Sequence, residues 1–164
     1  MSAGDNAQLH PVYESLACLA CPARNSDICG GMDDVEIRDL AGSSSRVQLK
    51  PGETLTWDGD AAKYSYVVTR GALRASKESD NGRRQILDFL FAGQFIGIPA
   101  GPDYHFNAEA LTEAEVCRFD RRKLEELMTK YPAVDRGYRA GTARQLEMAY
   151  DHAYALGRRT AMER

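Results

Sequence analysis

The chain has 164 residues, of which 43% are hydrophobic and 27% are charged. These proportions are typical of a folded globular protein, and the length suits one compact domain with an appended element. The formal net charge of −3 argues against a basic nucleic-acid-binding face in this chain. No apolar run reaches the roughly 18 residues of a membrane span, and residues 1–17 lack the pattern of a signal peptide. We therefore expect a cytoplasmic protein.

The first 30 residues form a polar leader that carries three of the four cysteines, Cys18, Cys21 and Cys29. Cys117 follows much later, in the run AEVCRFD. Because cytoplasmic thiols stay reduced, clustered cysteines there indicate a metal centre rather than disulfides. Four thiolates can hold a [4Fe–4S] cluster, a [2Fe–2S] cluster or one zinc ion. The seven residues between Cys21 and Cys29, without a second C-x2-4-C pair, favour iron–sulfur over zinc.

Residues 31–130 are expected to form a β-roll with flanking short helices. The run MDDVEIRDLAG predicts a short helix, with Asp33 or Asp34 as its N-cap and Gly42 at its end. Eight short apolar or alternating runs follow between about residues 46 and 119, separated by turns that contain glycine. This spacing predicts an antiparallel barrel or roll, which closes its own sheet edges. The runs are RVQLK, ETLTW, YSYVVTR, ALRASKE, RQILDFLF, QFIGI, FNAEAL and AEVCRF.

Two helices are predicted after the strands. The run FDRRKLEELMTKYP offers Asp120 as an N-cap, places Leu124 and Leu127 on one face, and stops before Pro132. The remaining residues to the C-terminus contain no further proline and are read as one long helix. We assign residues 131–164 to this helix.

The long helix carries a narrow stripe of small or apolar residues at heptad spacing, which is called the seam below. We expect two copies of the chain to associate along the seam, with packing of the helix on its own roll as the alternative. Gly137 and Gly141 each cost about 1 kcal/mol relative to alanine inside a helix, so they indicate close packing or a bend near its start. The seam consists of Thr142, Leu146, Ala149, Ala153 and Leu156.

Several segments resemble the CRP/FNR superfamily of bacterial regulators. PGETLTWDGDAAKYSYVVTRGALRAS is similar to the β-roll of that family, and AGQFIG to its next turn. CRFDRRKLEELMTKYP, followed by the long helix, resembles the FNR branch, particularly its alphaproteobacterial oxygen-sensing members. The resemblance covers nearly the whole chain from Cys18 onward. It implies an α+β fold, an antiparallel double-stranded β-roll of the cyclic-nucleotide-binding (jelly-roll) type with a cysteine-bearing N-terminal leader and a long C-terminal dimerisation helix.

The resemblance also implies a function. Cys18, Cys21, Cys29 and Cys117 would ligate a [4Fe–4S] cluster, which air degrades to [2Fe–2S] or removes. The whole regulator would be a homodimer that senses oxygen, binds DNA through a helix-turn-helix domain after the long helix, and contacts RNA polymerase. That domain is absent from this chain, so we expect only the sensory and dimerisation part.

Two other functions stay open at this point. One is a zinc-stapled β-roll that serves as an interaction module without redox sensing, and the other is an effector-binding roll. Cyclic nucleotides are not expected, because Ile98 stands at the place of a glutamate found in related domains and HFNA replaces the arginine set that contacts phosphate. The chain shows no nucleophile–base pair and no glycine-rich phosphate loop, so it is not expected to be an enzyme.

The surroundings of Cys117 decide the interpretation. Arg118, Arg121 and Arg122 follow it closely and either offset the negative charge of a thiolate-bound cluster or form a solvated helix start. The histidines at positions 10, 105 and 152 match no ligand spacing, so we assign them no metal. A shared centre requires folding to bring Cys117 within reach of the three leader cysteines.

Overall fold

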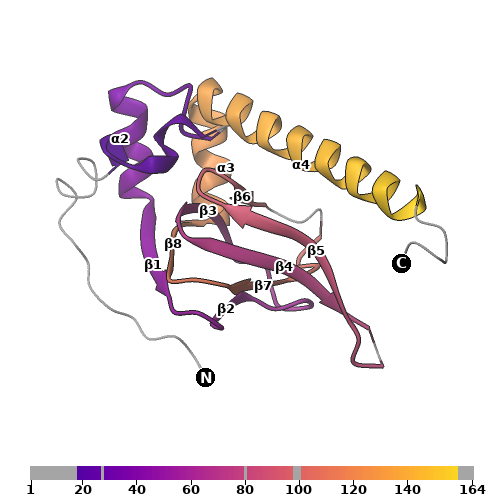
Figure 1. Cartoon of the computed structure of the whole chain (residues 1–164). Helices are drawn as coiled ribbons and strands as arrows, with labels where there is room; N and C mark the ends of the chain where they lie inside the picture. The colour runs from indigo at the N-terminus through magenta and orange to yellow at the C-terminus, as the bar shows by residue number, and fades with distance from the viewer. Residues whose placement is uncertain (1–17, 27, 80, 98–100, 159–164) are drawn as a thin grey trace.

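The computed structural model describes residues 18–26, 28–79, 81–97 and 101–158. Eight strands form two four-stranded antiparallel sheets that close into a β-roll, with the helices gathered at one end (Figure 1). The strands are β1 (Ser44–Leu49), β2 (Thr54–Thr56), β3 (Tyr64–Arg70), β4 (Ala72–Glu78), β5 (Arg84–Phe91), β6 (Phe95–Ile96), β7 (Asn107–Ala110) and β8 (Ala114–Asp120). One sheet has the order β1-β8-β3-β6 and the other β2-β7-β4-β5. All eight predicted strands and the predicted roll are confirmed.

Two hydrophobic clusters lie on opposite faces of the β1-β8-β3-β6 sheet. Because successive side chains of a strand point to opposite faces, Val68 and Val116 fill the inside of the roll while Val67 and Phe119 face outward. The outward cluster also receives Ile37 and Leu124 from the helices. The helical end of the molecule is therefore held by the outer face of this sheet.

The helical elements are the 3-10 helix η1 (Pro22–Asn25), α2 (Asp34–Gly42), α3 (Arg121–Lys130) and α4 (Pro132–Arg158). Helices α2 and α3 begin where their polar N-caps predict. The Asp33 carboxylate accepts from Val35 N at 2.8 Å and Glu36 N at 2.9 Å, and Glu36 in turn accepts from Asp33 N, which completes a capping box. Asp120 accepts from the amides of the first turn of α3, as expected. Proline at the first position of α4 needs no amide partner there.

A polar contact ties α2 to the junction of α3 and α4. Lys130 Nζ lies 2.7 Å from Asp39 Oδ2, and the Tyr131 hydroxyl donates to the same oxygen. These donors stabilise the charged carboxylate, so they lower the pKa of Asp39. The contact fixes the helix that follows the leader to the start of the long helix.

Helix α4 packs on the roll through its first half and runs on past it (Figure 1). Val134, Gly137 and Gly141 are buried, which confirms the close packing predicted near the start of the helix. Every residue of the seam is exposed. The helix thus contacts its own roll through one face and leaves the seam, on a neighbouring face, uncovered.

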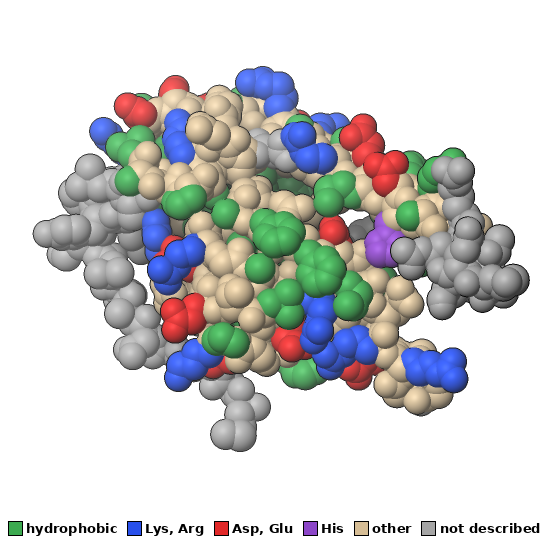
Figure 2. Space-filling view, viewed as in Figure 1, with side chains coloured by type: hydrophobic (Ala, Val, Ile, Leu, Met, Phe, Trp, Pro, Cys, Tyr) green, Lys and Arg blue, Asp and Glu red, His purple; other side chains and the backbone are tan. Residues whose placement is uncertain are grey.

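The outer face of the second sheet carries exposed apolar side chains. Phe89 and Phe91 on the edge strand β5 are 43% and 56% exposed, and Figure 2 shows the hydrophobic side chains that gather over this part of the roll.

No helix among the described residues has the length and hydropathy needed to cross a membrane. Residues 1–17 of the predicted leader and residues 159–164 of the predicted long helix lie outside the described residues.

The turn between β3 and β4 has no room for a side chain. Gly71 has φ +82°, and a Cβ built on it would lie 2.3 Å from the Glu113 carbonyl oxygen. Gly59 has a similar φ of +89°, but a Cβ there would meet nothing within 4 Å. A side chain at either position would strain the backbone, but only a side chain at position 71 would also overlap with other atoms. Comparing the two positions therefore distinguishes the two effects.

We predict that Gly71→Ala lowers the free energy of unfolding by about 3 kcal/mol or more, because left-handed strain and overpacking add at this position. Gly59→Ala should lower it by only about 1–2 kcal/mol, the strain alone. Urea unfolding followed by circular dichroism measures both. Equal losses in the two variants would contradict the steric argument.

Candidate metal centre

The thiols of Cys18, Cys21, Cys29 and Cys117 line one pocket between the leader, α2 and the outer face of the β1-β8-β3-β6 sheet. On β8, Cys117 lies between Arg46 of β1 and Val67 of β3 in the strand register. Strand alternation turns it outward, because Val116 before it faces the inside of the roll. The required meeting of Cys117 with the three leader cysteines is therefore present.

The leader is held on this face by two buried apolar side chains and by local turns. Ala23 and Ile28 are each 1% exposed and pack in the outward cluster with Val67. Cys21 N donates to Cys18 O at 3.2 Å, so the C-x2-C segment forms a tight turn that runs directly into η1. This packing places three thiols opposite β8.

Arg24 is a part of the site that sequence reasoning missed. Its guanidinium donates to the Cys29 carbonyl oxygen and, at 2.7 Å, to the Met32 carbonyl oxygen. It is also the one charged side chain among the described residues that line the thiol pocket. Its place in the run CPAR, three residues after Cys21, was a possible indication, but spacing does not show which carbonyls an arginine reaches.

The three arginines expected near Cys117 do not line the pocket. Arg118 donates to Ser45 Oγ at 3.1 Å and lies 4.7 Å from the centre of the Tyr64 ring. Arg121 pairs with Glu125 at 3.2 Å, and Arg122 is exposed in the first turn of α3. Strand alternation explains the position of Arg118, because the residue after an outward cysteine points to the opposite face, while Arg121 and Arg122 belong to α3. The alternative of a solvated helix start fits Arg121 and Arg122 better.

Burial keeps two of the thiols protonated in the absence of a cofactor. It raises the pKa of Cys29 to about 11, with Ser26 and the Arg24 charge opposing the rise, and the pKa of Cys117 to about 12, with a hydrogen bond to Ser44 opposing it. Since thiolates are the metal ligands, loading of this pocket must release protons and becomes easier as pH rises.

The donor set fits a thiolate-ligated centre, although the space must open. Four thiols line the pocket, and among the described residues no imidazole or carboxylate does so. Four cysteine thiolates are the ligands of most iron–sulfur clusters. The enclosed volume of about 20 Å³ holds little more than a water molecule. No three of the described His, Cys, Asp and Glu side chains are arranged to hold a single metal ion. The pocket therefore has to widen before a cluster can bind.

The segment that replaces the phosphate-contacting arginine set has structural partners. Phe106 packs against the core inside the roll, and Asn107 Oδ1 accepts from Asp58 N at 2.7 Å. Ile98, which stands at the place of the glutamate, lies outside the described residues. That the roll binds no cyclic nucleotide stays a prediction.

Comparison with known proteins agrees with this fold. The cyclic nucleotide-binding domain family matches residues 46–131. The nitrogen fixation regulation protein FixK of Bradyrhizobium diazoefficiens is 32% identical over 147 residues, covering 90% of this chain and 62% of that protein. The transcriptional activator protein FnrL of Cereibacter sphaeroides is 30% identical over 157 residues, covering 95% of this chain and 63% of that protein.

The solved structure of FixK2 from Bradyrhizobium japonicum is also similar, with a TM-score of 0.66 and 34% identity over 73% of this chain and 60% of that one. The chain spans less than two thirds of the length of these relatives. FnrL is named as a transcriptional activator and FixK as a regulation protein, which agrees with the expectation that the chain is not an enzyme. The chain belongs to the cyclic nucleotide-binding domain family, in its CRP/FNR group of transcriptional regulators.

Proposed function

We propose that the chain is the sensory and dimerisation part of an FNR-type transcription regulator, which senses oxygen through a [4Fe–4S] cluster on Cys18, Cys21, Cys29 and Cys117. One observation carries the proposal: a cysteine on β8 lines the same pocket as the three cysteines of the leader. Nearly a hundred residues separate the ends of this set in sequence, so their meeting depends on the fold. A cluster bound there would supply an oxygen-sensitive covalent link between leader and roll.

The residues around the pocket connect the leader with α4. Val67 lines the thiol pocket and pairs in register with Cys117 on one side and Phe95 on the other. The Phe95 ring meets the Tyr138 ring edge-on at 5.5 Å, and its carbonyl oxygen accepts from the Gln145 side chain. A displacement of the leader thus has a continuous packed route to the long helix.

The free energy that the leader contributes can shift an equilibrium only if it differs between the two states of α4. In the proposed mechanism the docked leader favours the α4 position in which the seam is paired. Release of the leader then shifts the population toward monomers.

The composition of the seam indicates that loss of the cluster weakens self-association without abolishing it. Leu146, Ala149, Ala153 and Leu156 carry no charge, so no buried repulsion would separate two subunits that have lost the cluster. We therefore expect the cluster-free chain to retain measurable self-association. In the whole regulator, a helix-turn-helix domain beyond α4 would read the two half-sites of a palindrome. The proposal also includes that the whole regulator binds DNA, contacts RNA polymerase and works in the cytoplasm.

The identity of the cofactor can be tested by reconstitution. Anaerobic reconstitution should give a brown protein with iron, acid-labile sulfide and a broad absorption band near roughly 400 nm that fades in air. Cys29→Ser and Cys117→Ser should lose the band to the same extent, because both thiols line one pocket. The measurement is the iron content per chain together with the absorption spectrum.

Other outcomes favour the alternatives. A colourless, air-stable protein with one zinc ion per chain would support a zinc-stapled interaction module. Full iron content in Cys117→Ser would exclude Cys117 as a ligand and remove the basis of the proposal. A metal-free chain that binds an effector inside the roll would support an effector-binding domain.

Arg24 tests the architecture of the leader. We predict that Arg24→Gln speeds the loss of the absorption band in air several-fold, because the Cys29–Met32 backbone loses both guanidinium hydrogen bonds. In the cluster-free protein the amides of residues 29–32 should exchange with deuterium faster, which mass spectrometry measures without any cofactor. Arg24→Lys keeps the charge and should restore the two rates only in part, since an ammonium group does not reproduce the planar fork.

Arg38 is the matched control, because it is an exposed arginine of α2. Arg38→Gln should leave both rates unchanged. Equal exchange at residues 29–32 in Arg24→Gln and the parent chain would show that Arg24 does not hold this loop.

The seam is tested by two identical substitutions on α4. Ala153 lies in the seam and Ala143 outside it, and both are exposed. Ala153→Glu should weaken self-association at least about tenfold, because it places like charges across the interface, whereas Ala143→Glu should have little effect. Analytical ultracentrifugation measures both. A parent chain without cluster that stays entirely monomeric at tens of micromolar would refute the expected self-association of the cluster-free chain.

A further inference from the structure

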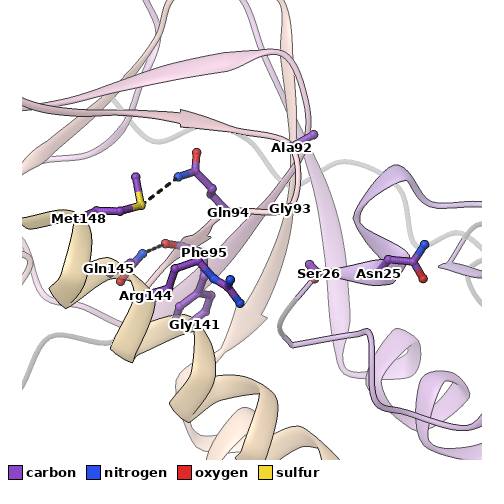
Figure 3. A pocket seen from close by; sticks show the side chains of 10 residues that line it. All are labelled: Asn25, Ser26, Ala92, Gly93, Gln94, Phe95, Gly141, Arg144, Gln145 and Met148. Carbon is purple, nitrogen blue, oxygen red and sulfur yellow. Dashed lines mark hydrogen bonds between the residues drawn. The ribbon is translucent and has the colours of Figure 1, made fainter. Parts of the chain in front are cut away.

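A second cavity of about 300 Å³ lies between the leader, the β5–β6 turn and α4 (Figure 3). Asn25 and Ser26 of the leader form one wall, and Arg144 of α4 points into the cavity from the other side. Its volume lies at the lower end of the range for small-molecule sites. We call this cavity the cleft.

The chemistry of the cleft is that of an anion site. Arg144 is the one charged side chain among the described residues that line it, and no carboxylate does so. The remaining polar side chains that face it are the Ser26 hydroxyl and the amides of Gln94 and Gln145, while the Asn25 amide points away from Arg144 (Figure 3). A guanidinium with neutral donors around it suits a carboxylate or a phosphate, which it binds through paired hydrogen bonds.

Contacts within the protein hold the helix side of the cleft in shape. Gln94 Oε1 accepts from Phe91 N at 2.6 Å, and Gln94 Nε2 lies 3.9 Å from the Met148 sulfur. Gln145 donates to the Phe95 carbonyl oxygen, and Gly93 N donates to Val68 O at 2.8 Å. A ligand would therefore find this wall largely formed, which reduces the entropy lost on binding.

The cleft is separate from the other surfaces of the protein. Successive residues of an α-helix are rotated by about 100°, so Arg144 and the seam residue Leu146 lie on opposite flanks of the face that carries Gly141, Gln145 and Met148 toward the roll. The cleft also contains none of residues 105–108, the HFNA segment discussed above for phosphate contacts.

The leader wall of the cleft belongs to the same loop as one cysteine. Ser26 O accepts from Gly30 N at 2.7 Å, and Cys29 N lies 3.5 Å from Ser26 Oγ. A molecule that contacts both Ser26 and Arg144 would therefore bridge the cysteine-bearing loop and the long helix. Its binding free energy would favour the docked leader.

We propose that the cleft binds a small organic anion, a carboxylate- or phosphate-bearing metabolite, which bridges Arg144 and the leader. Binding itself is independent of the function proposed above, whereas an effect of the anion on cluster lifetime rests on it. The anion is then a second input to the position of the leader, coupled reciprocally to the cofactor.

Isothermal titration of the cluster-free 164-residue chain with inorganic phosphate and, separately, with succinate tests the proposal and distinguishes the two kinds of anion. One of them should bind saturably, with a Kd on the order of 1 mM or below. Arg144→Gln should weaken that binding at least tenfold, and Ser26→Ala, a change on the opposite wall, several-fold. Arg139→Gln removes the same charge elsewhere on α4 and should bind as the parent does.

No saturable binding of either anion, or unchanged binding in an Arg144→Gln protein whose circular dichroism matches the parent, would overturn the proposal. Unchanged binding in Ser26→Ala would overturn the bridging role of the leader. In a reconstituted protein, the anion that binds should slow the loss of the roughly 400 nm band in air. Because the titrations use cluster-free chain, failure of the cleft and failure of the cluster assignment give different results.

Discussion

The arrangement of the whole protein depends on the alternation of side chains along β8 and β3. Val116 and Val68 face into the roll, and their neighbours Cys117 and Val67 therefore face outward. A shift of one residue in the register would reverse both sets, bury the thiol in the core and expose the valines. The hydrophobic filling of the roll thus specifies the orientation of Cys117 as firmly as it specifies the fold.

The outer face of this sheet joins the leader, α2, α3 and α4 in one apolar cluster. The leader attaches through Ala23 and Ile28, while α3 and α4 attach through Leu124 and Val134. Since one apolar cluster holds all of them, a movement of the leader changes the surroundings of the helices directly. The short cysteine-bearing leader can therefore affect the packing of the much longer helix α4.

Helix α4 presents different surfaces on faces that its 3.6-residue period separates. Its buried face, with Gly137 and Gly141, lies against the roll. The seam occupies one flank, and Arg144 with the cleft occupies the other. Glycine on the buried face brings the backbone close to the roll, which is why these residues are present despite their low helix propensity.

Sequence alone determined the strands, the capped helices, the seam and the four cysteines, because alternation, N-cap residues and heptad spacing are local properties. It did not determine which side chains surround the thiols. Arg118, Arg121 and Arg122 lie close to Cys117 along the chain, yet Arg24 lines the pocket with it. The tertiary structure decided this, as it decided the cleft, because both are formed by segments far apart in sequence whose meeting depends on packing around one sheet face.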